Sequence, residues 1–212
     1  LVLIDPNVML SLTENQKNIL STEVLNMGIE AYLSQKANFF SDMFVEKGLE
    51  LLSYAIDGSP SLDITTPAEI LLAQAGIMIS LASAASSLGL SSLLSLTINS
   101  RYRINKSLIS SILITYAIEE ASQFKAAKIE KIAHIMNIVP KDVTGEDAIK
   151  LFLEYLRQKT AKNDLPARLK DVQLSIEELS LAVEDVNQID IVNKLPRSMT
   201  TDDIFDFIKR AY

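Results

Sequence analysis

Apolar residues recur every three or four positions along most of the chain, which places them on one face of a helix with 3.6 residues per turn. The pattern predicts helices near 15–34, 41–56, 67–87, 89–99, 106–122, 124–137, 146–161, 175–187 and 201–211. No two alternating apolar runs joined by an Asn-Gly or Asp-Gly turn interrupt them. The predicted fold class is therefore all-α, with residues 1–212 forming a single multi-helix domain. The opening run LVLID, ended by Pro6, is the exception and predicts a short strand or linker over 1–6.

Three helix starts carry capping signals. The sequence TPAE at 66–69 places a Thr at the N-cap, a Pro at the first helical position and a Glu at the third, so that hydroxyl and carboxylate can satisfy free backbone N–H groups. The sequences SIEE at 175–178 and TTDD at 200–203 repeat this pattern. We expect a helix to begin at each of these points.

Residues 70–100 contain no charged side chain, and a run of this length could cross a bilayer. The run also contains eight Ser, one Gln and two Gly, and Gly89 lies where two helices would meet. This composition favours a buried central helical hairpin over a membrane segment, which stays the alternative.

Composition narrows the functional classes. The net charge is −7, with 27 acidic and 20 basic residues, which opposes binding to a phosphate backbone. The absence of Cys excludes disulfides, thiolate metal sites and a cysteine nucleophile, and it fits a cytoplasmic protein. The chain starts at Leu1 rather than Met, and LVLID lacks the basic start and long apolar run of a signal peptide. We expect that the chain begins inside a larger protein.

Residues that could carry catalysis are few. His134 is the only histidine and lies in a helical stripe of Ile and Met, which favours a partly exposed structural role over a catalytic one. One His without Cys can form neither a His-dependent triad nor a multi-His metal site. No GxGxxG or GxxxxGK loop is present, so a dinucleotide-binding motif would have to lie upstream. Several aromatic residues at helical spacing are predicted to be core: Phe39, Phe40, Phe44, Phe152, Tyr155, Phe205 and Phe207.

Four stretches resemble the second half of the iron-containing alcohol dehydrogenases, which have the dehydroquinate synthase-like fold. LVLIDPNVMLSL at 1–12 resembles the strand and turn that leave the family's dinucleotide-binding domain. GIEAYLSQKANFFSD at 28–42 resembles the family's HAIEAYVS..ANP.SD stretch. The sequences at 165–186 and 195–212 resemble its closing helices in order and spacing. The resemblance implies the C-terminal helical domain of such a protein.

The resemblance also locates the family's metal site. Its ligands are an Asp, a His one helical turn later, a second His after a Gly-Leu-x pattern, and a third His fourteen residues further on. With IEAY in register, Glu23 matches the Asp and Met27 matches the first His. Placing GLSS on the Gly-Leu-x-His pattern puts Ser92 at the second His and Lys106 at the third. A further family His, near the nicotinamide, corresponds to Leu96.

These departures change the chemistry of the site. Ferrous iron or zinc needs nitrogen or oxygen donors that are free of protons. Met27 is a poor donor for these metals, Ser92 is a weak neutral one, and Lys106 brings a positive charge to the place of a cation. Only Glu23 remains a plausible ligand, so we expect no specific divalent metal and a degenerate metal site.

Several roles for the basic residues stay open. Lys106 could form a salt bridge with Glu23 in the place of the ion, or both side chains could simply solvate a cleft. Lys106 could also polarise a substrate carbonyl as an electrophile for hydride transfer. Arg101 and Arg103 form a small basic cluster with Lys106, either as a solvated helix end or as a contact for an anionic ligand such as cofactor phosphate.

Three functional hypotheses follow. The first is a domain of an iron-containing alcohol dehydrogenase-like protein that has lost metal-dependent oxidoreductase chemistry and acts as a ligand-binding or structural module. The second is a metal-independent NAD(P)-linked oxidoreductase of alcohols or aldehydes, and the third is a membrane-associated helical protein. We expect no cofactor to be held by this chain alone, with NAD or NADP bound through an upstream dinucleotide-binding domain as its partner. Nucleic acid and membrane are not expected as partners, and a homodimer is left open.

Overall fold

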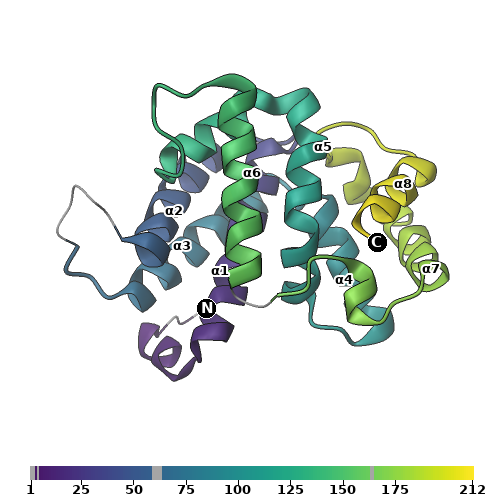
Figure 1. The fold of residues 1–212 in the computed structure, drawn as a ribbon, viewed down its shortest axis with the longest axis horizontal. Helices are drawn as coiled ribbons and strands as arrows, with labels where there is room; N and C mark the ends of the chain where they lie inside the picture. Colours follow the sequence, from purple (N-terminus) through teal and green to yellow (C-terminus); the bar gives the residue numbers. More distant parts are fainter. Residues whose placement is uncertain (1–2, 4, 59–63, 163–164) are drawn as a thin grey trace.

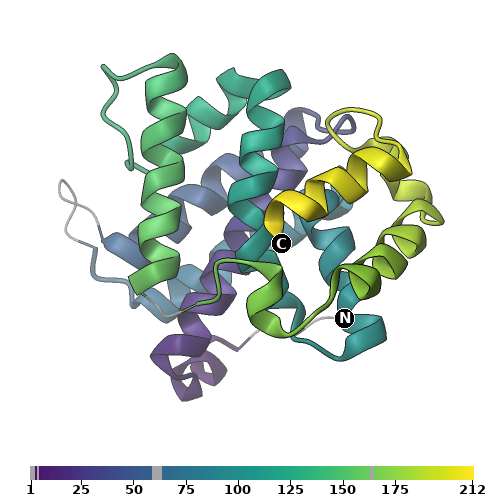
Figure 2. The same ribbon diagram turned by 45° about the vertical axis from the view of Figure 1, so that its right-hand side comes forward.

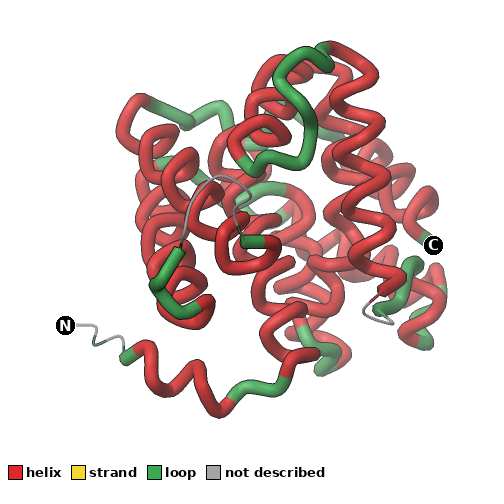
Figure 3. The backbone as a smooth tube through the Cα atoms, turned by 60° about the vertical axis from the view of Figure 1, so that its left-hand side comes forward, coloured by secondary structure: helices red, strands yellow, loops and turns green. Residues whose placement is uncertain are grey.

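The computed structural model describes residues 3, 5–58, 64–162 and 165–212. These residues form eight α-helices, three short 3-10 helices and no strand (Figure 3). The α-helices are α1 (Glu14–Leu33), α2 (Phe39–Asp57), α3 (Ala68–Ala85), α4 (Leu90–Tyr102), α5 (Lys106–Ile135), α6 (Gly145–Lys162), α7 (Ile176–Asn187) and α8 (Thr201–Ala211). The 3-10 helices are η1 (Pro6–Ser11), η2 (Leu169–Val172) and η3 (Asp190–Lys194). The predicted all-α class is confirmed.

The strand predicted over 1–6 is not seen. Residues 1, 2 and 4 lie outside the described part of the chain, Leu3 and Asp5 are not in a strand, and Pro6 begins η1. The Asp5 side chain accepts a hydrogen bond from the backbone N–H of Asn7 at 2.9 Å, which starts a helical turn directly after the proline. This local bond favours a turn over an extended backbone.

Two apolar cores organise the helices. One contains buried residues of α1, α2, α3 and α6, and the other contains buried residues of α4, α7 and α8. Helix α5 contributes to both, with Ile112 in the second core and Ile118 in the first. Figure 1 shows α2 and α3 on one side of the molecule and α7 and α8 on the other, with α5 and α6 between them. Figure 2 shows α8 reaching back to α5, against which it packs.

Two of the three predicted capping boxes are confirmed. Ser175 and Thr200 each accept from the backbone N–H three residues later, and the acidic side chain at that position accepts from the cap's own N–H. The prediction at 66–69 is wrong, because α3 begins at Ala68 with no side-chain cap. Glu69 instead forms an ion pair with Lys17 of α1 at 2.8 Å. The Glu69 carboxylate therefore binds a lysine of another helix, although the local sequence had predicted that it would cap α3.

The uncharged run forms two helices, α3 and α4, but not the predicted hairpin. Helix α3 packs against α1 and α2, whereas α4 packs against α5 and α7, so the two belong to different cores. Loop 86–89 therefore connects the two cores. Among the described helices, α3 alone is long and apolar enough to cross a membrane by length and composition, which the core helix of a soluble protein can also be.

The two helices predicted at 106–122 and 124–137 form one element, α5, with a kink. Lys125 leaves helical geometry at φ −133° and ψ 30°, close to the predicted break. The half of α5 before the kink contributes buried side chains to both cores, and the half after it contributes to the first core only. The kink lies beside Phe124, whose ring is half exposed with the Arg197 guanidinium 5.5 Å from its centroid.

The aromatic prediction holds for some residues and fails for others. Phe152 and Phe207 are fully buried, and Phe44, Tyr155 and Phe205 pack against the cores. Phe39 and Phe40 are 76% and 65% exposed, so their assignment to the core is wrong. They are the first two residues of α2, whose buried face starts only at Ser41.

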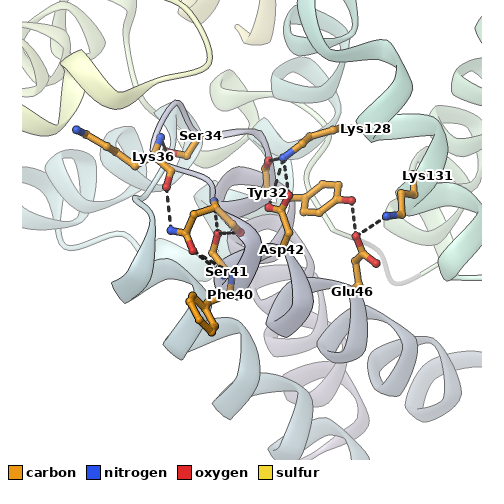
Figure 4. A network of polar contacts seen from close by, with 10 residues as sticks. Tyr32, Ser34, Lys36, Phe40, Ser41, Asp42, Glu46, Lys128 and Lys131 are labelled. Carbon is orange, nitrogen blue, oxygen red and sulfur yellow. Dashed lines mark hydrogen bonds and ion pairs between the residues drawn. The ribbon is translucent and has the colours of Figure 1, made fainter.

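A polar network joins α1, α2 and α5 outside the first core (Figure 4). Lys128 of α5 donates to the backbone carbonyl of Tyr32 at 2.7 Å and to Asp42 of α2 at 3.0 Å. The Tyr32 hydroxyl and Lys131 both donate to Glu46 at 2.6 Å. These contacts fix the end of α1 and thus the orientation of the face that carries the candidate site.

Candidate functional site

The candidate site lies along one face of α1. Glu23, Asn26, Met27 and Glu30 are spaced by three and four residues, so their side chains leave α1 in the same direction. Helix α1 contacts α4 and α5 here, between the two cores. Two of these four residues, Glu23 and Met27, were predicted from the resemblance.

The structure brings Glu23 and Lys106 together. The Lys106 ammonium donates to Glu23 Oε1, and the Ser107 hydroxyl donates to Glu23 Oε2. The Glu23 side chain is 11% exposed and the Lys106 side chain 46% exposed, so the carboxylate is covered while the ammonium faces solvent. The salt bridge considered from the sequence is thus present at Oε1, and the other carboxylate oxygen accepts from the neutral Ser107 hydroxyl.

Glu23 also faces the start of α5. Asn105 caps that helix by accepting from the N–H of Ser107 at 2.9 Å, and Lys106 is its first helical residue. A carboxylate is favoured at the positive end of a helix dipole, whereas a cation there is not. The contact with Glu23 therefore offsets the unfavourable interaction between the Lys106 charge and the dipole of α5.

A second carboxylate of α1, Glu30, faces the start of α4. Helix α4 has no side-chain cap of its own, and Glu30 Oε1 accepts from the N–H of Ser92 at 3.0 Å. Burial raises the pKa of the Glu30 carboxyl, and hydrogen bonds from Ser92 and from the backbone at Gly89 and Ser91 oppose that rise. A Cβ on Gly89 would lie 2.6 Å from Glu30 Cδ, which explains why a glycine precedes α4.

Ser92 and Met27 occupy different surroundings along this face. Ser92 is buried, and its hydroxyl lies 3.5 Å from Asn26 Nδ2. Met27 is half-buried and packs against the first core. At one end of the face, Glu23 contacts Lys106. At the other end, Asn26 and Glu30 contact Ser92. Met27 lies between Glu23 and Glu30 in the sequence.

In the described part of the chain, the remaining predicted site residues form no hydrogen bond or ion pair with this face. Leu96 is 41% exposed on α4. Arg101 forms an ion pair with Asp185 of α7, with Nη2 2.8 Å from Oδ1. Arg103 is exposed and ends α4 in the left-handed conformation at φ 58°. The engagement of Arg101 with α7 gives that residue a structural role within this chain.

His134 has the partly exposed position predicted for it. Its side chain is 19% exposed, Nδ1 lies 3.2 Å from the carbonyl oxygen of Val139, and Nε2 lies 3.6 Å from Glu130. These contacts hold the end of α5 against the following turn. The residue belongs to neither end of the candidate site.

The donors on this face do not fit the metal that the resemblance implies. Both oxygens of Glu23 accept from Lys106 and Ser107, and the Met27 and Ser92 positions offer a thioether and a neutral hydroxyl. In the described ranges, no three or more His, Asp or Glu side chains gather where they could hold an ion. What the arrangement can do is pair a buried carboxylate with an exposed ammonium and hold the starts of two helices.

Three residues of the site were missed by sequence reasoning. Ser107 directly follows Lys106, so a polar neighbour was visible but had no assigned partner. Glu30 belongs to the quoted GIEAY stretch, and Asn26 lies four residues before it on the same helical face. Their role depends on where α4 starts relative to α1, which no local signal specifies.

The fold is that of known alcohol dehydrogenases. A 1,3-propanediol oxidoreductase superposes with a TM-score of 0.87 at 17% identity, covering 98% of this chain and 55% of that one. The alcohol dehydrogenase from Oenococcus oeni gives 0.87 at 19% identity, covering 98% and 54%. Sulfoacetaldehyde reductase from Bifidobacterium kashiwanohense, solved in complex with NAD+, gives 0.72 at 14% identity, covering 98% and 53%.

The chain therefore spans about half the length of the solved structures that it matches. At these identities the structures show the fold alone. A comparison with curated proteins found no significant match. The model of the Fe-containing alcohol dehydrogenase family, C-terminal region, matches residues 21–212. Because that match covers nearly the whole sequence, the chain belongs to the iron-containing alcohol dehydrogenase family and corresponds to its C-terminal helical domain.

Proposed function

We propose that this domain works without the divalent metal of its family and serves as a ligand-binding or structural module. The proposal is supported mainly by two hydrogen bonds: Lys106 donates to one Glu23 oxygen and Ser107 donates to the other. An ammonium at this carboxylate supplies one positive charge, and a divalent ion in the same place would meet it with repulsion. The metal-dependent oxidoreductase chemistry of the family is therefore lost in this proposal.

A metal-independent NAD(P)-linked oxidoreductase is the second candidate, and it is supported by the exposure of Lys106. Its side chain is 46% exposed, so the ammonium can meet a substrate carbonyl while it pairs with Glu23. A singly charged, flexible ammonium is a weaker electrophile than a fixed metal ion. For this reason the structural or ligand-binding role is our first choice.

Elemental analysis tests the loss of the metal. We expect less than about 0.1 equivalent of iron, zinc or nickel in protein purified without added metal, because the site lacks the donor set of these ions. One equivalent of iron or zinc would overturn the proposal. Turnover of alcohols or aldehydes that depends on NAD(P) and survives chelation would favour the second candidate.

A restored variant tests the register on which the proposal depends. Glu23→Asp, Met27→His, Ser92→His and Lys106→His together rebuild the family's ligand set. If the four positions converge, this variant binds close to one equivalent of zinc, measured by competition with a chromogenic chelator. The control carries Met27→His and Ser92→His but keeps Lys106, and we expect at least tenfold weaker binding from it. Equal zinc binding by both variants would contradict the role assigned to Lys106.

A further inference from the structure

A small cavity of about 50 Å³ lies beside Glu30, on the inner side of the candidate site. It is partly open and is lined by α1, the start of α4, the middle of α5, the segment 195–199 and α8. Most of its walls are apolar, including Ile29, Ala121 and Phe207. Glu120, Phe124 and Arg197 also line it. The Glu120 carboxylate forms ion pairs with Arg197 and Arg210.

Two buried oxygens belong to residues that line this cavity. Asn26 is 1% exposed and Glu30 is 5% exposed. Asn26 Oδ1 and Glu30 Oε2 have no hydrogen-bond partner in the described part of the chain. Leaving such an acceptor buried without a partner costs about 1–3 kcal/mol, and more for a charged group. Two such acceptors four residues apart on one helix face call for a donor between them.

The charges of Glu23 and Glu30 are balanced differently. Glu23 pairs with Lys106, whereas no Lys, Arg or His of the described residues forms an ion pair with Glu30. Backbone N–H groups at the start of α4 bind one Glu30 oxygen only, because the other has no partner. Burial of this carboxyl without a cation raises its pKa, and a cationic ligand would favour the charged form.

We propose that this cavity binds a short primary alkylammonium ion, whose ammonium donates to Glu30 Oε2 and Asn26 Oδ1 and whose alkyl chain lies against Ile29 and Ala121. An ammonium has three N–H donors and can serve both oxygens at once, whereas an alcohol hydroxyl has a single proton. A water needs about 10–15 Å³ of such volume, so the cavity takes a ligand of roughly three or four non-hydrogen atoms. Ethylammonium and propylammonium fit this size. The proposal does not rest on the loss of the metal.

A titration with propylammonium chloride tests the site. We expect saturable binding to the purified chain at pH 7, followed by ¹H–¹⁵N shift changes, with propan-1-ol binding at least tenfold more weakly. Glu30→Gln and Asn26→Leu should each weaken propylammonium at least tenfold, because each removes one acceptor. Ala121→Leu fills the cavity without touching either acceptor and should abolish binding. The control Glu50→Gln, the same change at a partly exposed position of α2, should leave the affinity unchanged.

Other results would overturn the proposal. Absence of saturable propylammonium binding would do so, as would equal binding by the wild type, Glu30→Gln and Ala121→Leu. Propan-1-ol binding as tightly as propylammonium would show that the site prefers an uncharged head group. A crystal structure grown with propylammonium that contains only water between Glu30 and Asn26, or an Asn26 amide that itself donates to Glu30, would also contradict it. Circular dichroism of each variant separates lost binding from lost folding.

Discussion

Replacing Gly89 by alanine is the sharpest test of how α1 and α4 are joined. The added Cβ would lie 2.6 Å from Glu30 Cγ and Cδ and 2.7 Å from Oε1, closer than real Cβ contacts. Glu30 is buried, so its side chain has little room to move aside. The carboxylate must leave the N–H of Ser92, or α4 must shift away from α1.

Two contributions determine how far Gly89→Ala should lower the free energy of unfolding. Overpacking of a buried site costs about 1–3 kcal/mol. Loss of a hydrogen bond to a charged acceptor costs about 1.5–3 kcal/mol. The two are not additive, because moving the carboxylate relieves the clash, and we expect a total of about 3 kcal/mol. For a domain of this size that corresponds to a fall in Tm of roughly 6–12 °C.

Urea unfolding followed by circular dichroism measures this change, with Gly76→Ala as the matched control. A Cβ on Gly76 would meet only Val24 Cγ2 at 3.9 Å, and Gly76 lies inside α3. Alanine there should stabilise the protein by about 0.5–1 kcal/mol through helix propensity. In the background Glu30→Ala, the cost of Gly89→Ala should fall below about 1 kcal/mol, because the clashing atoms are gone. If Gly89→Ala is as stable as the wild type, the tight contact between Glu30 and α4 is refuted.

Three further predictions concern Glu46 of the polar network, the buried Phe152 and the exposed Phe39. Burial opposes ionisation of Glu46, but hydrogen bonds from Lys131 and Tyr32 outweigh it and hold the pKa of this carboxyl below its usual value. Its contribution to stability is therefore full above the pKa of the unfolded chain and is lost as pH falls through the lower folded value, so Glu46→Gln should reduce the difference between urea midpoints at pH 7 and pH 3. Phe152→Ala should destabilise by about 3–5 kcal/mol, because Phe152 is fully buried in the first core. Phe39→Ser should change the free energy of unfolding by less than about 0.5 kcal/mol, because that ring is 76% exposed, and a larger loss would show that this surface is covered in solution.

Much of the fold could be predicted because helix periodicity is a local property. The α-helix starts at Ile176 and Thr201 followed from capping residues that bond within one turn. The predicted helices 106–122 and 124–137 placed a break two residues before the kink at Lys125. Burial and pairing of helices did not follow, because an uncharged run shows neither how much of a segment is buried nor what it packs against. Only 28% of α3 is buried. Helices α3 and α4 share that composition and yet belong to different cores.

The candidate site was predictable only where a resemblance supplied the register. Glu23 and Lys106 are 83 residues apart, and no local pattern relates them. Their contact requires the start of α5 to lie beside the middle of α1. Ser107 and Glu30 could not be assigned from the sequence because their partners are a distant carboxylate and the backbone of a distant helix start. Side chains whose role depends on tertiary position carry no signal of their own.

The distribution of stabilising energy explains how such a site can change while the fold persists. The ion pair of Glu23 with Lys106 involves a half-exposed ammonium, and pairs of this kind contribute about 0–1 kcal/mol. Each core buries many large apolar side chains, and losing one such side chain costs about 2–5 kcal/mol. A change of polar side chains on this face would therefore leave the stability of the fold to the cores, which fits a TM-score of 0.87 at 17% identity. For the same reason, likeness of fold says little about the chemistry of a site, which depends on the side chains that the site presents.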